Sequence, residues 1–243
     1  MLEHALQGWL HQTERPHEII VAWDGDVPKG VHSTHRIIHI AVPRTGPNAN
    51  RNGARNAAAA HATGTHLWFV DGDFIPEATC IENALLALAE EDCALSPVLV
   101  GIRATWEAWT ANPYPRQFAI LANQWSGFAE LYRPEKRGAT APAKVTEGFP
   151  LVRSDVFWEL GGFDASYTGW GANKEEFIDR LRCLHEFYPY KLLVCSRMYH
   201  QPHASEGDQT CSLVLENQKR RTEAAQSPNL VNLASRVRVL CGF

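Results

Sequence analysis

The sequence lacks any uninterrupted apolar segment near the roughly 20 residues that a membrane-spanning helix requires. Its first residues, Met1 to His4, also lack the pattern of a secretory signal, a basic stretch followed by an apolar one. We therefore expect a cytoplasmic protein with no transmembrane segment.

An excess of positive charge is also missing. The chain has 23 lysine and arginine residues against 27 aspartate and glutamate residues, which gives a net charge of −4. We therefore expect no nucleic-acid partner and no anionic membrane surface, and any phosphate group must be bound by local contacts. Apolar residues make up 45% of the chain and charged residues 21%, values that exclude a disordered or fibrous protein.

Cysteine is present but lacks the spacing of a zinc site or a disulfide framework. The six cysteines form no Cys-x-x-Cys pair, and most lie in apolar or helical stretches. We interpret them as reduced thiols of the core. They are Cys80, Cys93, Cys183, Cys195, Cys211 and Cys241.

The sequence does contain an alternation of strand and helix patterns over 243 residues, with no dividing linker. This alternation predicts one α/β domain over residues 1–243, with a largely parallel sheet and helices on both faces. Between residues 105 and 146 the pattern weakens into aromatic, proline and glycine residues, which suggests a helix and loops over a cleft. The expected strands are 18–23, 36–42, 67–70, 94–102 and 191–198, and the expected helices are 2–12, 53–62, 76–91, 154–160, 174–187 and one after Leu215.

The run from Leu67 to Val70 ends at two carboxylates, Asp71 and Asp73, separated by Gly72. The run is apolar and long enough for a buried strand. A turn at Gly72 can direct both carboxylates to one point beyond the carboxyl end of the strand, the edge where ligands bind in open α/β sheets. Two such oxygen ligands suit Mg²⁺ or Mn²⁺. Taken alone, the motif also fits a plain turn after a strand.

Six short motifs follow one another along the chain. They are Asp24 at the end of a strand, Arg51 to Asn56, Asp71 to Asp73, Gly161 to Asp164, Gly169 to Gly171, and Tyr199 to His203. Together they resemble the nucleotide-sugar glycosyltransferases of the GT-A fold, specifically the inverting family 2 and its galactosyltransferase-like relatives. The resemblance runs from Leu2 to about Asn217 and implies a Rossmann-like mixed sheet. It also implies a nucleotide-sugar-binding half over residues 1–102 and an acceptor and metal half over residues 103–243.

Residue by residue, the resemblance implies contacts to a UDP-sugar donor. Asp24 would accept a hydrogen bond from the uracil N3–H. Arg51 or Arg55 would lie near the diphosphate, and Asp71 and Trp170 would also contact the donor. Taken alone, Asp24 fits a turn, the two arginines fit a solvated helical face, and Trp170 fits a buried core residue.

The resemblance also implies a metal site. Asp71 and Asp73 look like the metal-binding pair of the family, and His200 looks like a third ligand from the far side of the site. An imidazole can join two carboxylates around Mn²⁺. His203 remains an alternative ligand, and we favour His200 because it directly follows an expected strand. Both histidines also fit a surface turn.

The segment that carries the catalytic base in the galactosyltransferase-like relatives, Gly-Trp-Gly-Gly-Glu-Asp, is altered in this chain. The Glu-Asp positions hold Asn173 and Lys174, neither of which is an anionic base. Glu175 is the nearest replacement, and Glu176 matches a later acidic position of the family. We expect Glu175 to take the proton of the acceptor hydroxyl. The alternatives are a base from elsewhere in the chain, or loss of transfer.

Family members begin with a central strand, whereas this chain begins at the helix that follows it. Without that strand its neighbours would carry unpaired backbone groups. The run from Arg236 to Cys241 reads as such a strand, which suggests a circularly permuted fold. Two arginines in the run count against full burial. Two alternatives remain, a first strand lost through a misplaced start and an edge strand that pairs with a second subunit.

These inferences predict a metal-dependent glycosyltransferase that moves a sugar from a UDP-sugar to an acceptor hydroxyl with inversion. The alternative is a non-catalytic nucleotide-sugar-binding protein that kept the donor site and lost the base. A metal-dependent nucleotidyltransferase fits less well, because no glycine-rich phosphate loop with a lysine or arginine follows an opening strand.

Overall fold

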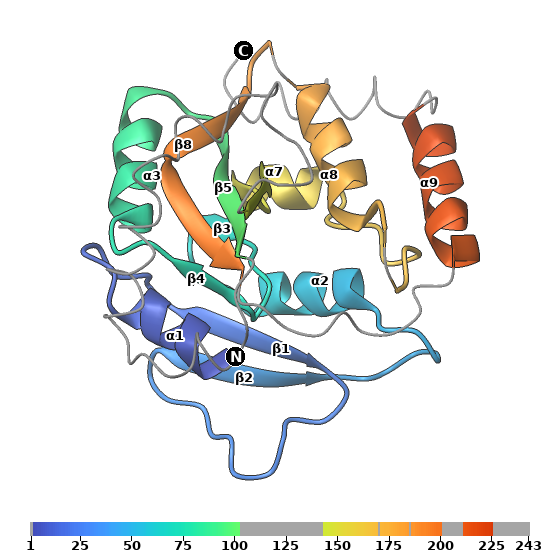
Figure 1. Cartoon of the computed structure of the whole chain (residues 1–243), viewed down its shortest axis with the longest axis horizontal. Helices are drawn as coiled ribbons and strands as arrows, with labels where there is room; N and C mark the ends of the chain where they lie inside the picture. The colour runs from blue at the N-terminus through green and yellow to red at the C-terminus, as the bar shows by residue number, and fades with distance from the viewer. Residues whose placement is uncertain (1, 103–142, 170, 185, 201–210, 226–243) are drawn as a thin grey trace.

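The computed structural model describes residues 2–102, 143–169, 171–184, 186–200 and 211–225, which form an α/β fold (Figure 1). The strands are β1 (Ile19–Asp24), β2 (Ile37–Val42), β3 (His66–Trp68), β4 (Phe74–Pro76), β5 (Ala94–Ile102), β6 (Ala143–Glu147), β7 (Leu151–Arg153) and β8 (Tyr190–His200). The helices are α1 (Leu2–Leu10), α2 (Arg51–His61), α3 (Cys80–Glu90), α7 (Ser154–Glu159), α8 (Asn173–Arg182) and α9 (Cys211–Ala225).

The larger sheet is mixed, with parallel and antiparallel strand pairs, and is not the largely parallel sheet that the alternation of patterns predicts. β1 and β2 form a parallel two-stranded sheet. The larger sheet has the order β3-β7-β5-β8-β4, and β6 pairs with β5. Within it β5 and β8 are parallel, while the pairs that include β4, β6 and β7 run antiparallel. The expectation of a largely parallel sheet is wrong because three short strands pair antiparallel with their neighbours, and the result is the mixed sheet that the resemblance implies.

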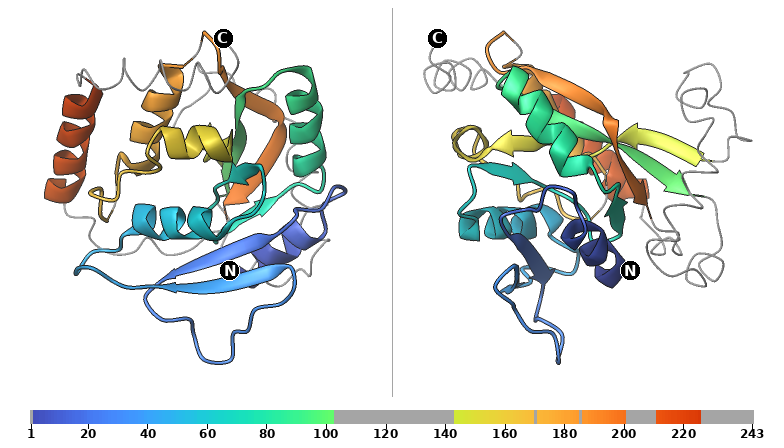
Figure 2. Two further views of the ribbon diagram at one scale, coloured as in Figure 1. Left: turned by 180° about the vertical axis from the view of Figure 1, so that it is seen from behind. Right: turned by 90° about the vertical axis from the view of Figure 1, so that its left-hand side faces the viewer.

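Three helix positions matter for the site. α2 packs against β1 and β2 and lies between this pair and the rest of the fold, as the opposite views of Figures 1 and 2 both show. α8 packs beside α9, and α3 packs against β8. The start of α2 thus lies near the carboxyl ends of β1 and β2, where the sequence motifs predict the donor.

An aromatic cluster forms the core behind the site. Phe69, Phe157, Phe163 and Phe177 are buried, and their rings contact one another at centroid separations between 4.6 and 5.6 Å. Burial of each such ring stabilises the fold by about 1.5–3 kcal/mol. The cluster therefore fixes the end of β3, helix α7, the glycine corner that follows it, and α8 relative to one another.

Most of the expected elements are present. The expected strands 18–23, 36–42, 94–102 and 191–198 correspond to β1, β2, β5 and β8, and the six expected helices correspond to α1, α2, α3, α7, α8 and α9. The strand expected at 67–70 ends earlier, at Trp68, and β4 is an element that the pattern did not predict. In the part of the chain that the structure describes, no helix is both long and apolar enough to cross a membrane.

Two sequence predictions lie outside the described residues. They are the cover of helix and loops over a cleft, most of which falls in 103–142, and the permuted strand at 236–241. Within the described ranges, β1 and β3 belong to separate sheets. The circular permutation and its two alternatives therefore remain predictions.

The interpretation of the cysteines as core thiols is confirmed for two of them. Burial raises the pKa of the Cys80 thiol to about 12 and that of Cys93 to about 11, so both stay protonated at neutral pH. Cys183 and Cys195 are free but exposed, and for them the core interpretation is wrong. Cys195 lies between Leu193 and Arg197 of β8, where the pairing with β5 shifts register, and its neighbour Val194 is exposed as well.

Candidate functional site

Asp24 is the last residue of β1 and lies at the carboxyl end of the strand. Its Oδ2 accepts a hydrogen bond from the backbone N–H of Asn50 at 3.2 Å, and the guanidinium of Arg44 lies 3.9 Å away. Gly25 follows with a φ of 120°, which favours glycine, and the chain leaves the strand there. The carboxylate is therefore fixed beside the N-terminus of α2.

The asparagines of α2 connect this end of β1 to the loop before α8. Asn50 caps the helix with its side chain. Asn52 donates a hydrogen bond to the carbonyl oxygen of Asp164 at 2.9 Å. Asn56 donates to the carbonyl oxygen of Phe163 at 2.7 Å and accepts from its N–H at 2.9 Å. The loop at 163–164 is thus held by side chains of α2 whose partners lie more than a hundred residues away in sequence.

Arg55, on the same helix, points at the carboxylate of Asp71. Its Nη2 donates to Asp71 Oδ1 at 2.6 Å and its Nη1 donates to Asn52 Oδ1 at 3.0 Å. Its guanidinium carbon lies 4.0 Å from the ring centroid of Phe149, so the cation stacks on an aromatic face. The structure therefore gives Arg55 partners within the protein. Arg51 is the first residue of α2.

Asp71, Gly72 and Asp73 form a turn between β3 and β4, as expected. The N–H of Phe74 donates to the carbonyl oxygen of Asp71 at 3.2 Å and closes the turn. β4 then pairs with β8 in a register that sets Phe74 opposite His200. As a result, Nε2 of His200 lies 3.1 Å from Oδ2 of Asp73, although 127 residues separate them in sequence.

The structure brings two of the three predicted metal ligands together, Asp73 and His200, while Asp71 is bound by Arg55. Among the described residues, no group of three His, Cys, Asp or Glu side chains is arranged to hold a metal ion. The residue types still fit a divalent ion, because one short turn carries two carboxylates, one of them beside an imidazole from β8, and Mn²⁺ accepts both kinds of ligand. Joint coordination by all three remains a prediction, and His203 lies outside the described residues.

The loop before α8 has a backbone suited to glycine. Gly169 and Gly171 have φ angles of 68° and 96°, and the N–H of Gly169 donates to the carbonyl oxygen of Ala49 at 2.8 Å. Ala172 also has a positive φ of 58° although it carries a Cβ. A non-glycine residue in this region stores strain of about 1–3 kcal/mol. Trp170 lies outside the described residues, and its contact with the donor remains a prediction.

Glu176 lies in the first turn of α8 and is buried. Arg180 donates to both of its carboxylate oxygens, from Nε at 2.6 Å and from Nη2 at 2.7 Å. A third hydrogen bond runs from Arg180 Nη1 to the carbonyl oxygen of Leu160 at 2.6 Å. Arg180 therefore links α8 to the end of α7, and Glu176 is occupied by a structural ion pair with it.

Glu175 lies on the side of α8 that faces α9. Asp179, one helical turn further on, accepts two hydrogen bonds from Arg221 of α9 at 2.6 and 3.0 Å. These bonds raise the pKa of the Arg221 guanidinium, and the negative charge of Glu175 adds to the shift. Lys174 differs, because its Nζ lies 5.8 Å from the ring centroid of Phe149. This turn thus brings a lysine cation toward the Phe149 ring.

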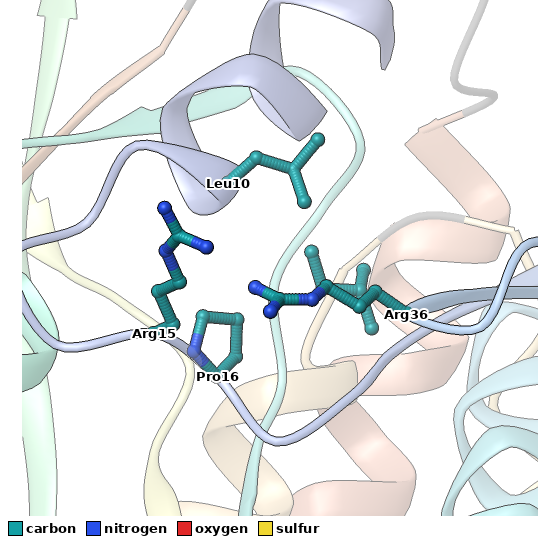
Figure 3. Close-up of a pocket in the computed structure, with 5 residues that line it drawn as sticks. Leu10, Arg15, Pro16 and Arg36 are labelled. Atoms are coloured by element: carbon teal, nitrogen blue, oxygen red, sulfur yellow. The ribbon is translucent and has the colours of Figure 1, made fainter.

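A small surface hollow lies at the other end of β1 (Figure 3). Ile19 begins this strand and Asp24 ends it, so the hollow is not part of the candidate site. It is lined by Leu10, Arg15, Pro16, Ile19 and Arg36.

Sequence reasoning missed three residues of this site, Asn52, Asn56 and Phe149. The two asparagines belong to the Arg51 to Asn56 motif, at the start of an expected helix, so their spacing of four residues was an available signal for a shared face. Phe149 carried no signal, because its role depends on the stacking of Arg55 from a distant helix.

Comparison with known proteins identifies a family and a similar fold. The sequence model described as glycosyl transferase family 2 matches residues 1–161. Among solved structures 63 chains match, and one of them is a crystal structure of GalNAc-T7 with UDP, GalNAc and Mn²⁺. The similarity to that structure has a TM-score of 0.50 at 17% sequence identity and covers 77% of this chain but 36% of the other. The search of curated proteins found no match.

Proposed function

This chain belongs to glycosyl transferase family 2, and from that premise we propose that it transfers a sugar from a UDP-sugar to an acceptor hydroxyl, with inversion and with the help of a divalent metal ion. The resemblance to a GT-A structure extends over 77% of the chain, which supports the same fold for the donor site. The acceptor is a carbohydrate or another molecule with a free hydroxyl group.

The observation that carries this proposal is the position of His200 beside the Asp-Gly-Asp turn. Nε2 of His200 lies 3.1 Å from Asp73 Oδ2, at the carboxyl side of β3 and β8 where the donor would bind. A plain turn after a strand would need no imidazole from another strand. A divalent ion held by Asp71, Asp73 and His200 would neutralise the charge that develops on the leaving diphosphate.

The other side chains of the proposed site act on the donor and on one another. Asp24, held by the N–H of Asn50, accepts from the uracil N3–H. Arg51 at the start of α2 faces the diphosphate. Trp170, between two glycines with positive φ, closes over the sugar and excludes water.

We predict that Asp24→Asn removes most of the preference for uracil. An asparagine keeps the shape of the side chain but offers both donors and acceptors, so it also accommodates cytosine. The loss of a charge-assisted hydrogen bond corresponds to roughly a 10-fold or greater loss of UDP affinity. Titration calorimetry with UDP and with CDP measures the change.

Asp26→Asn is the matched control, because Asp26 is an exposed carboxylate two residues further along. It should bind both nucleotides as the unaltered protein does. Unchanged UDP affinity and unchanged discrimination in Asp24→Asn would reject the assignment of Asp24 to the base.

We keep Glu175 as the proposed base, because Glu176 is occupied by Arg180 and neither Asn173 nor Lys174 carries a carboxylate. Glu175→Gln should then lower the rate of transfer by roughly 10²-fold or more, with UDP binding nearly unchanged, since only proton transfer is removed. Asp179→Asn is the control, because it removes a carboxylate from the same face of α8. Equal rates for Glu175→Gln and the unaltered protein would reject this base.

A second candidate function is a non-catalytic nucleotide-sugar-binding protein. The observation that favours it is the direction of Glu175 toward α9, together with the lysine beside Phe149. Such a protein would bind UDP-sugar without transferring the sugar to any acceptor. Assays of transfer with several acceptors, run on protein that binds UDP, separate the two functions.

A further inference from the structure

Arg55 is held in one orientation by contacts on three sides. Asn52 accepts from its Nη1 at 3.0 Å, the ring of Phe149 lies 4.0 Å from its guanidinium carbon, and Phe163 lies 5.8 Å away. Its side chain is only 11% exposed. A guanidinium fixed in this way presents its remaining N–H groups in one direction.

That direction is toward Asp71. Nη2 of Arg55 donates a hydrogen bond to one carboxylate oxygen of Asp71, Oδ1, at 2.6 Å, and the Asp71 side chain is 40% exposed. Arg55 therefore restricts the rotation of the carboxylate, while part of the Asp71 side chain remains accessible to solvent. Because Asp71 stands on a turn of three residues, without such a partner its side chain could take other rotamers.

We infer that Arg55 is a positioning residue, which orients Asp71 for a divalent metal ion and does not itself bind the diphosphate. This inference rests on the proposed function of the site. Partners that orient metal ligands commonly change metal affinity by roughly 10–100-fold when they are replaced. Phe149 acts indirectly, since its ring stacks on the guanidinium of Arg55 and holds it in place.

If residue 55 instead contacted the phosphate directly, it would need only a positive charge. A lysine can serve a phosphate as a point charge, but it cannot bond Asn52 and Asp71 at once with the geometry of a planar guanidinium. The variant Arg55→Lys therefore distinguishes the two roles. Arg55→Gln removes the charge altogether, and Phe149→Leu removes the ring while leaving the ion pair in place.

The experiment measures Mn²⁺ binding without nucleotide, by electron paramagnetic resonance of free Mn²⁺, and UDP binding in EDTA, by calorimetry. We expect Arg55→Gln and Arg55→Lys each to weaken Mn²⁺ binding by roughly 10–100-fold, and Phe149→Leu to weaken it by a smaller factor. UDP affinity in EDTA should stay the same in all three variants. Should Arg55→Gln fold poorly, Arg55→Lys and Phe149→Leu test the same point.

Arg153→Gln is the matched control, because Arg153 also pairs with carboxylates but does so beside His66, at the opposite end of β3 from Asp71. Its Mn²⁺ affinity should equal that of the unaltered protein. Two results would overturn the inference. One is normal Mn²⁺ binding by Arg55→Lys. The other is a loss of UDP affinity in EDTA for Arg55→Gln that is absent in Arg55→Lys. If the unaltered protein binds neither Mn²⁺ nor UDP, the proposed function fails as well, so the two failures are distinguishable.

Discussion

Replacement of Arg180 by methionine is expected to lower the free energy of unfolding by about 3–5 kcal/mol, because it leaves the carboxylate of Glu176 buried without its counter-charge. Glu176 is 7% exposed as a side chain and takes two hydrogen bonds from Arg180. The bond from Arg180 to the carbonyl oxygen of Leu160 is lost too. Urea unfolding followed by circular dichroism measures the change.

Two further variants, a control and a double substitution, test whether the lost stability comes from the unpaired Glu176 carboxylate. Arg182→Met is the matched control, since Arg182 is half exposed and lies 3.7 Å from Asp179. This substitution should lower the free energy of unfolding by no more than about 1 kcal/mol. The double variant Glu176→Leu with Arg180→Met removes both charges and should recover much of the lost stability. Equal stability of Arg180→Met and Arg182→Met would contradict a structural role for this ion pair.

The largest effect on activity is expected for Asp73→Asn. The substitution keeps the shape of the side chain but removes the charge that faces His200 at 3.1 Å, and with it one predicted metal ligand. Loss of electrostatic stabilisation at the leaving diphosphate should lower the rate of transfer by roughly 10²–10³-fold. Rates at saturating UDP-sugar, over a range of Mn²⁺ concentrations, measure the effect.

Asp92→Asn serves as the control for Asp73→Asn. Asp92 is an aspartate that pairs with Arg153 at the far end of β3. The Asp92→Asn variant should transfer sugar at the rate of the unaltered protein. A normal rate for Asp73→Asn would show that Asp73 takes no part in the reaction.

The local elements of the fold could be predicted, because their patterns are uninterrupted. The strand expected at 94–102 is β5 as the structure has it, since nine consecutive residues there suit a buried strand. β4 could not be predicted in the same way. It has only three residues and exists because it pairs with β8, more than a hundred residues away.

The site could be predicted as a list of residues but not as a set of contacts. The order of motifs pointed to Asp24 and His200, each the last residue of a strand, and to Asp73, directly before β4. The ion pair between Arg55 and Asp71 depends on how α2 packs against the turn, which no local pattern encodes. The direction of Glu175 likewise depends on where α8 begins and on the packing of α9.

The most direct test of a UDP-sugar site in this protein is the binding of UDP to the unaltered chain, measured by calorimetry with Mn²⁺ and again with EDTA. We predict that UDP binds in the presence of Mn²⁺ and that EDTA weakens the binding by roughly 10-fold or more, because a divalent ion held by Asp71, Asp73 and His200 would supply positive charge to the diphosphate. The absence of UDP binding under both conditions, or equal affinity with and without Mn²⁺, would contradict the account.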